Sequence, residues 1–144
     1  MRIKFILALL LLIFACALQA WFASIGVFID LILATTIIFA LFFDIWELLI
    51  FVLFSVLVIN WQPAFSVEIL LFGLIPLIVQ GFYRFFGLIA WATAPFAIIF
   101  GFLFFYLGVA PTMFLVNIVP FSMDLFGGLI FGTLVYLALG RANK

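Results

Sequence analysis

Gln80-Gly81-Phe82-Tyr83-Arg84-Phe85-Phe86 is the stretch of sequence that decides the path of the chain. Arg84 is the only positive charge between Lys4 and Arg141, and the residues around it are almost all apolar. Basic residues of membrane proteins concentrate on the cytoplasmic side. The side of the membrane on which Arg84 lies therefore fixes the path of every helix before and after it.

The composition is that of an integral membrane protein. Hydrophobic residues make up 72% of the 144 residues and charged residues only 7%, whereas a soluble domain carries about 25% charged residues. So few charges could not cover a water-facing surface, and no polar stretch is long enough to form a soluble domain. The sequence predicts an all-α fold in a single transmembrane domain, residues 1–144.

The residue inventory also limits the possible functions. The net charge is zero, so a nucleic-acid partner has no electrostatic basis. Histidine is absent and Cys16 is the only cysteine. The chain therefore has no internal disulfide framework, no zinc motif built on histidine and no nucleophile activated by histidine. The Gly127-Gly128 pair is not followed by the Lys-Ser/Thr of a phosphate-binding loop. We expect no cofactor, no metal site and no enzymatic activity.

Breaks in the apolar pattern predict six helices. The first is preceded by two basic residues and is interpreted as a retained helix, with a cleaved signal peptide as the alternative because Ala15-Cys16-Ala17 has a small-x-small pattern. Residues 112–122 are interpreted as a loop or as a short re-entrant or interfacial helix. The predicted helices span residues 3–23, 27–43, 46–59, 64–83, 85–107 and 123–139.

The distribution of charge tests this count. If the chain starts in the cytoplasm, six crossings bring all five Lys and Arg residues to the same side, as the positive-inside rule requires. A five-helix arrangement would move Arg141 and Lys144 to the opposite side. The sequence thus predicts a polytopic six-transmembrane-helix bundle with both termini cytoplasmic.

On this topology a group of polar residues lies at the outer side. Carboxylates close to a bilayer are costly and often functional, so the group could line an outward-facing pocket for a small ligand or a cation. Alternatively, each residue lies at a helix boundary, where it is solvated or caps the helix. The candidate residues are Asp30, Asn60, Glu68, Asn117 and Asp124.

Asp44 and Glu47 stand just before an apolar run. An acidic residue followed by Glu three positions later is a capping pattern, in which Asp44 accepts from open amides and Glu47 lies in the positive first turn. A catalytic or ion-binding carboxylate pair is the alternative. We interpret the pair as a helix cap.

Two patterns of small residues predict close helix approach. Gly128 and Gly132 form a GxxxG motif, and Ala90 and Ala94 form a similar face on the preceding predicted helix. Both packing within the bundle and contact with a partner protein would use such faces. Gln19 and Gln80 are the polar residues nearest to helix interiors, where a side-chain hydrogen bond to a neighbouring helix or a transport role would account for them.

Several of these features together resemble the rod shape-determining protein MreD family. Leu18-Gln19 near the end of the first helix is followed by a short outer turn and then by Ile29-Asp30-Leu31-Ile32-Leu33, similar to the family's Pro-Asp/Asn-Leu-Leu-Leu. A short inner turn before the third helix, a basic residue after the fourth and the total length also fit. Ile29 replaces the family's proline, and Leu53-Phe54-Ser55 with Asn60 replaces its glycine-rich third helix ending in aspartate.

This resemblance implies a non-enzymatic scaffold of the bacterial inner membrane that takes part in cell-shape determination and peptidoglycan synthesis. Its partners would be a single-span MreC-like protein and the wall-synthesis complex. MreD proteins resemble in fold the S components of energy-coupling-factor vitamin transporters, so a small-solute binding subunit or small transporter subunit is the alternative. The Ala-xxx-Ala docking face that S components often carry on the first helix is reduced here to Ala20-xxx-Ser24.

Overall fold

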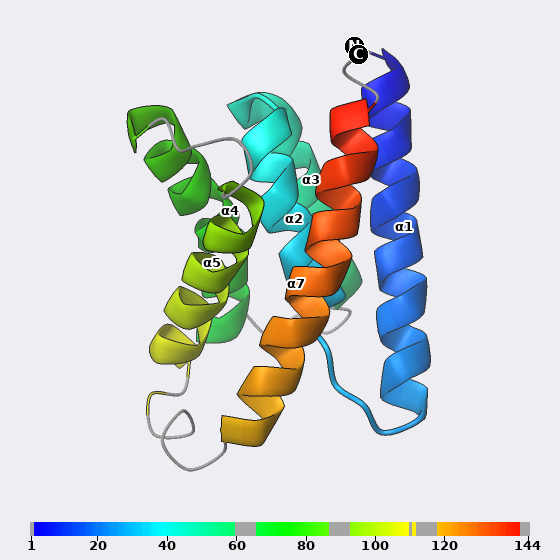
Figure 1. The fold of residues 1–144 in the computed structure, drawn as a ribbon, viewed down its shortest axis with the longest axis vertical. Coiled ribbons are helices and arrows are strands. Elements are labelled where there is room, and N and C mark those ends of the chain that lie inside the picture. The colour runs from blue at the N-terminus through cyan, green and yellow to red at the C-terminus, as the bar shows by residue number, and fades with distance from the viewer. Residues whose placement is uncertain (1, 60–65, 87–92, 110, 112–117, 142–144) are drawn as a thin grey trace.

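The computed structural model describes residues 2–59, 66–86, 93–109, 111 and 118–141, and within them the chain forms six helices that run alternately up and down (Figure 1). The fold is all-helical, as the sequence predicts. The helices are α1 (Arg2–Ser24), α2 (Leu31–Phe42), α3 (Ile45–Ile59), α4 (Val67–Phe86), α5 (Thr93–Val109) and α7 (Ile118–Arg141).

Three of these helices are long and apolar enough to cross a membrane: Ile3–Ser24 in α1, Val67–Phe85 in α4 and Ile118–Arg141 in α7. The other three are apolar but shorter, from 12 residues in α2 to 17 in α5. The helices therefore support the membrane character predicted from composition. They also differ in length more than the sequence pattern suggests.

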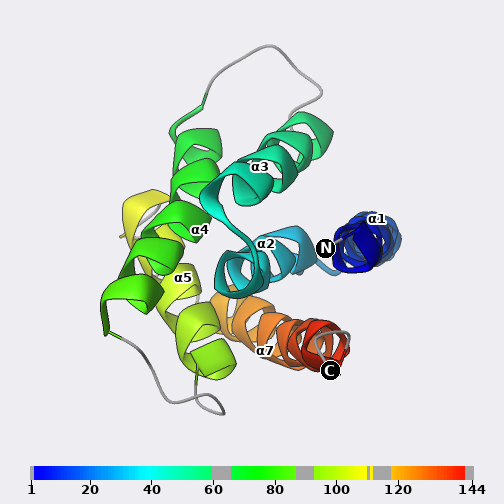
Figure 2. The ribbon, with the colours of Figure 1, turned by 90° about the horizontal axis from the view of Figure 1, so that it is seen from above.

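α2 is the central element of the bundle. Seen from above, it is surrounded by the other helices (Figure 2), and it contacts each of the other five described helices. Every residue from Leu31 to Ala40 is buried. The largest fully buried side chains around it include Phe39 of α2, Phe51 of α3 and Phe102 of α5. The core of the protein is thus formed by the packing of the other helices around one short central helix.

The start of α2 differs from the prediction. We expected a helix from residue 27, whereas α2 begins at Leu31 and residues 27–30 form no regular secondary structure. Gly26 turns the chain with a φ of +80°, a conformation that glycine adopts without steric cost. The chain then reverses direction and runs along the bundle from the end of α1 to the start of α2 (Figure 1). Asp30 consequently lies just before the first residue of α2, closer to the middle of the bundle than the end of α1.

Other boundaries also shift. α7 begins at Ile118, five positions before the predicted start at 123, because Pro120 falls in the first turn, where its missing N–H group breaks no helical hydrogen bond. α4 continues to Phe86, past the predicted end at 83, and α5 begins at Thr93. Residues 112–117, most of the predicted loop or re-entrant segment, lie outside the described residues.

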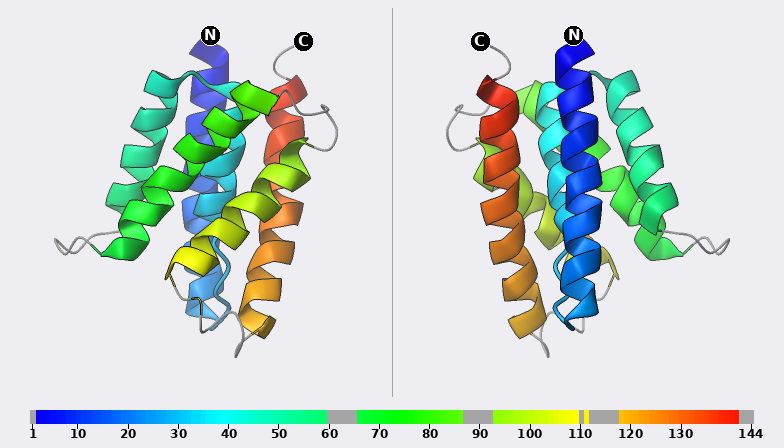
Figure 3. Two further views of the ribbon diagram at one scale, coloured as in Figure 1. Left: turned by 90° about the vertical axis from the view of Figure 1, so that its left-hand side faces the viewer. Right: turned by 90° about the vertical axis from the view of Figure 1, so that its right-hand side faces the viewer.

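The two termini lie at the same end of the bundle (Figures 1 and 3). α1 begins there, and α4 and α7 end there, so Lys4, Arg84 and Arg141 lie at one end. We call it the basic end. The opposite end carries the start of α2, the start of α4 and the start of α7, and with them the acidic residues Asp30, Glu68 and Asp124. We call it the acidic end.

The glycines of α7 pack inside the bundle. A Cβ atom on Gly128 would lie 2.9 Å from the Phe102 ring of α5, and one on Gly132 would lie 2.5 Å from the Ile98 side chain of α5. Ala94, also on α5, is 1% exposed, and Ala90 lies outside the described residues. Gly128 and Gly132 therefore face α5 and α2 within the bundle.

Replacing Gly128 tests this packing. We expect Gly128→Ala to destabilise the bundle by about 1–3 kcal/mol, because the buried aromatic ring of Phe102 cannot yield as a flexible chain end can. Thermal unfolding of the purified protein in detergent measures the effect. The matched control is Gly81→Ala in α4, where nothing lies within 4 Å of the new Cβ. Helix propensity should make that variant neutral or more stable by about 0.5–1 kcal/mol, and equal destabilisation of both would contradict the assignment.

Candidate functional site

The acidic end contains a polar cluster built around the first residues of α2. Asp30 is the N-cap of this helix: its carboxylate Oδ1 accepts a hydrogen bond from the Leu33 N–H at 3.1 Å, and its backbone carbonyl accepts from the Ala34 N–H at 3.4 Å. Aspartate is a favoured N-cap because its side chain satisfies amides that lack a partner within the helix. Asp30 thus supplies two of the acceptors that the helix start needs.

Two other helices supply further acceptors. The Gln19 Oε1 atom of α1 accepts from the Ile32 N–H at 3.0 Å, and the Asp124 Oδ1 atom of α7 accepts from the Asp30 N–H at 2.6 Å. The remaining amide, that of Leu31, donates to the Ile29 carbonyl at 3.1 Å. Every backbone N–H from residue 30 to residue 34 therefore has a partner. Side chains of α1, of the N-cap of α2 and of α7 accept from three of them, and backbone carbonyls accept from the other two.

Asp124 also has a partner on a fourth helix, α5. The Tyr106 hydroxyl of α5 donates a hydrogen bond to the Asp124 Oδ2 atom, so both carboxylate oxygens have partners. Asp124 is only 8% exposed. A buried carboxylate is costly unless it accepts several hydrogen bonds. Here it accepts one from α5 and one from the start of α2, and joins these helices to α7.

The opposite end of α2 is also capped by another helix. The Phe43 N–H donates to the Phe39 carbonyl at 3.0 Å, and the Gln80 Nε2 atom of α4 donates to the Phe43 carbonyl at 2.7 Å. Gln80 is 2% exposed. Within α2, Thr35 and Thr36 donate their hydroxyl hydrogens to carbonyls of the preceding turn. Gln19 and Gln80 thus both make interhelical hydrogen bonds, one of the two interpretations of the sequence.

Two small cavities flank Asp30. One, of about 180 Å³, is lined by Gln19, Asp30 and Glu68 together with apolar residues that include Phe72 and Phe105. The other, of about 230 Å³, is lined by Gln19, Asp30, Asp124 and neighbouring apolar residues. Pockets for small-molecule ligands measure roughly 300–1,000 Å³. Both cavities are smaller than that range.

The structure brings together only part of the predicted outer polar group. Asp30 and Asp124 are hydrogen-bonded to each other through the Asp30 backbone, and Glu68, an exposed residue in the first turn of α4, faces the smaller cavity with Asp30. Asn60 and Asn117 lie outside the described residues. Within the described residues no three Asp, Glu or Cys side chains are grouped so that they could hold a metal ion.

Tyr106 belongs to the cluster but was not among the residues predicted from the sequence. It lies in a helix rich in phenylalanine, and its hydroxyl group is the feature that could have indicated a polar partner. A tyrosine hydroxyl in an apolar environment usually finds a hydrogen-bond partner. The identity of that partner depends on the packing of α5 against α7, which the sequence pattern does not give.

Asp44 and Glu47 lie at the basic end, at the start of α3. The Asp44 carbonyl accepts the first helical hydrogen bond from the Leu48 N–H at 2.9 Å, and Glu47 is in the first turn. The side-chain partner of Asp44 is Arg84 of α4, at 3.0 Å, instead of an α3 amide. Asp44 holds the position of a cap residue, while its carboxylate joins α4 to the turn between α2 and α3.

Comparison of the chain with protein-family models, with curated proteins and with solved structures finds no significant match.

Removing the Tyr106 hydroxyl tests the cluster. We expect Tyr106→Phe to lower the unfolding free energy by about 0.5–2 kcal/mol, the range of interhelical hydrogen bonds in membrane proteins. A double-mutant cycle with Asp124→Ala, which removes both acceptor oxygens, isolates the coupling between the two side chains when unfolding is measured in detergent. Tyr83→Phe is the control, because the Tyr83 hydroxyl has no hydrogen bond in the described part of the chain. A coupling energy near zero would contradict the assignment.

Proposed function

We propose that the protein is a non-enzymatic scaffold of the MreD type in the bacterial inner membrane. It crosses the membrane six times, with both termini in the cytoplasm. It docks membrane partners, an MreC-like single-span protein among them, through helix faces and outer loops. In this way it helps to organise the wall-synthesis complex during cell elongation.

The observation that carries this proposal is the closed hydrogen bonding of the polar cluster. Asp30, Gln19 and Asp124 all accept from the amides at the start of α2, and Asp124 is further bound by Tyr106. These groups are therefore engaged in holding the fold. A binding site for a solute would need polar groups that are free to leave their protein partners, and cavities larger than the two beside Asp30.

The outer surface supports a role in protein contacts. Large hydrophobic side chains are exposed on α1, α3, α4, α5 and α7, such as Leu10, Leu57 and Leu134. Apolar side chains on the outside of a membrane protein face either lipid or the helix of a partner. Such faces can dock a single-span protein without any catalytic or ligand-binding group.

The grouping of basic residues supports the proposed orientation. Lys4, Arg84 and Arg141 lie at the end of the bundle that also carries both termini. The positive-inside rule assigns such an end to the cytoplasm. The acidic end then faces the periplasm, where the soluble part of a single-span partner would extend.

Site-specific photo-crosslinking tests the scaffold proposal. A photoreactive amino acid is placed in cells at one outward position of each of four helices, with buried Leu48 of α3 as the matched control. We expect at least one outward position to crosslink to a single-span protein with a periplasmic domain or to a wall-synthesis enzyme, and Leu48 to give no intermolecular product. The outward positions are Leu10, Leu57, Leu70 and Leu134.

The adducts are identified by mass spectrometry after affinity purification. Crosslinks to paired ATPases and a large transmembrane coupling subunit would replace the scaffold by a vitamin-transporter subunit. Crosslinks to lipid alone at all four positions would contradict docking through these helix faces.

The second candidate function is small-solute binding, and the observation in its favour is Glu68, an exposed carboxylate that lines the cavity beside Asp30. Glu68→Gln separates the two functions, because Glu68 lines this cavity and takes no part in the capping of α2. The scaffold proposal predicts that this variant restores normal cell shape in cells that lack the protein, to within about 10% of the wild-type level. Loss of complementation with unchanged thermal stability would favour the solute-binding function.

A further inference from the structure

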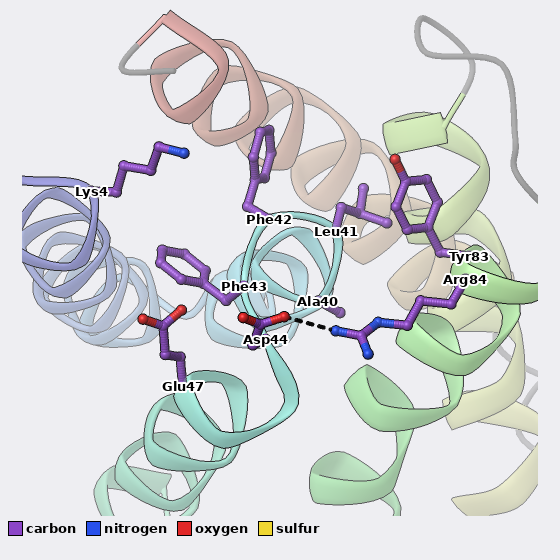
Figure 4. A pocket seen from close by; sticks show the side chains of 9 residues that line it. All are labelled: Lys4, Ala40, Leu41, Phe42, Phe43, Asp44, Glu47, Tyr83 and Arg84. Atoms are coloured by element: carbon purple, nitrogen blue, oxygen red, sulfur yellow. Dashed lines mark hydrogen bonds and ion pairs between the residues drawn. The ribbon is translucent and has the colours of Figure 1, made fainter. Parts of the chain in front are cut away.

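A cavity of about 370 Å³ opens at the basic end, between the start of α1, the turn from α2 to α3 and the end of α4. Figure 4 shows its charged side chains: Lys4 and Glu47 lie on the side of α1 and α3, and Arg84 lies on the side of α4 beside Tyr83. Phe42 and Phe43 form part of its apolar wall. The cavity is thus lined by both signs of charge around an apolar base.

Four charged side chains line the cavity, and only two of them pair with each other. Asp44 and Arg84 form an ion pair at 3.0 Å. Lys4 and Glu47 are half-buried, and neither makes an ion pair with another described residue. Among the described residues, the Lys4 ammonium group and the Glu47 carboxylate thus line the cavity without an ion-pair partner. Its net charge is zero.

A second, apolar cavity of about 140 Å³ adjoins the first. It lies between the end of α2, α4 and α5, and its walls include Val79, Phe82 and Phe100. The charged cavity at the end of the helices and the apolar slot lie side by side, with Leu41 and Tyr83 in the wall of both. This sequence of polar and apolar space matches the headgroup and chain of a lipid.

We propose that the two cavities form a binding site for an aminophospholipid, a lipid whose headgroup carries a phosphate and a primary ammonium. The phosphate lies near Lys4, and the ammonium donates hydrogen bonds to Glu47. The first methylene groups of one acyl chain enter the apolar slot past Leu41 and Tyr83. The rest of the lipid lies along the apolar outer surface of α4 and α5.

The balance of charge selects this lipid class. An anionic lipid such as phosphatidylglycerol would bring hydroxyl donors but no cation to Glu47, and would leave the site with a net negative charge, which is unfavourable where the groups are partly buried. A choline headgroup has the same net charge but no N–H group to donate to the Glu47 carboxylate. Only a headgroup with a phosphate and a primary ammonium satisfies both available charges.

Native mass spectrometry of the delipidated full-length protein in detergent tests the site. The probes are dioleoyl phosphatidylethanolamine, phosphatidylcholine and phosphatidylglycerol, each titrated separately. We expect the ethanolamine lipid to bind about tenfold more tightly than the other two, a ratio that corresponds to about 1.4 kcal/mol. Equal affinity for the three lipids would overturn the proposal.

Two charge variants separate the roles of the headgroup contacts. Glu47→Gln should reduce the preference for ethanolamine over choline to about twofold or less, because a neutral amide holds the ammonium weakly. Lys4→Gln should weaken all three lipids by a similar factor, about tenfold, since each carries the phosphate. Arg141→Gln removes a charge from the same end without touching the cavity, and should leave the ethanolamine preference unchanged. A wild-type preference in Glu47→Gln would contradict the assignment.

The apolar slot is tested by Leu41→Trp, which fills the junction of the two cavities. Leu41 is half-buried, and thermal unfolding checks that this variant remains folded. Affinity for the ethanolamine lipid should fall about tenfold, while the weak affinity for soluble phosphoethanolamine should stay the same. If Leu41→Trp folds and binds the lipid as the wild type does, or if phosphoethanolamine binds as tightly as the lipid, the ligand is a soluble phosphate and the lipid assignment is wrong.

Discussion

The backbone amides at the start of α2 impose the constraint on which the rest of the bundle depends. At 1.5 Å per residue, the 12 residues of α2 extend about 18 Å, whereas the hydrocarbon core of a bilayer is about 30 Å thick. At least one end of this central helix therefore lies where water does not satisfy open amides and carbonyls. In such a place every backbone polar group needs a partner within the protein. Gln19, Asp30 and Asp124 provide it at one end, and Gln80 provides it at the other.

This constraint also determines how the surrounding helices are arranged. Burial of apolar surface contributes little to helix association in a bilayer, because lipid is as apolar as the helix faces. Close packing and interhelical hydrogen bonds must hold the helices together instead. Gly128 lets α7 approach α5, and Tyr106 and Asp124 join the same two helices near the acidic end. The caps of α2 thus orient α1, α4, α5 and α7 around it.

The sequence predicts the helical architecture well, because turns and charges interrupt the apolar pattern clearly. It does not reveal that α2 is central. With 72% hydrophobic residues, a helix buried in protein and a helix exposed to lipid have the same composition, so hydropathy cannot separate them.

The prediction of a helix from residue 27 placed Asp30 inside the helix, whereas its side chain caps the helix at Leu31. The link between Tyr106 and Asp124 joins two helices whose relative rotation is set by packing, which no local pattern encodes. The grouping of Lys4, Arg84 and Arg141 at one end was easier to predict, because Arg84 stands alone among apolar residues.

The two ends of the bundle use their charged residues differently. At the acidic end, Asp30 and Asp124 are bound to amides of α2, so a ligand could take them only by leaving buried donors without partners. An unsatisfied buried donor costs about 1–3 kcal/mol, a large fraction of the stability of a small bundle. At the basic end, Lys4 and Glu47 cap no buried amide in the described structure, and they line an open cavity. Ligand binding there would leave the caps of α2 intact. Both ends thus hold α2 in place, through Asp30 and Asp124 at one end and Gln80 at the other, but only the basic end also carries charged side chains, Lys4 and Glu47, that take no part in these contacts.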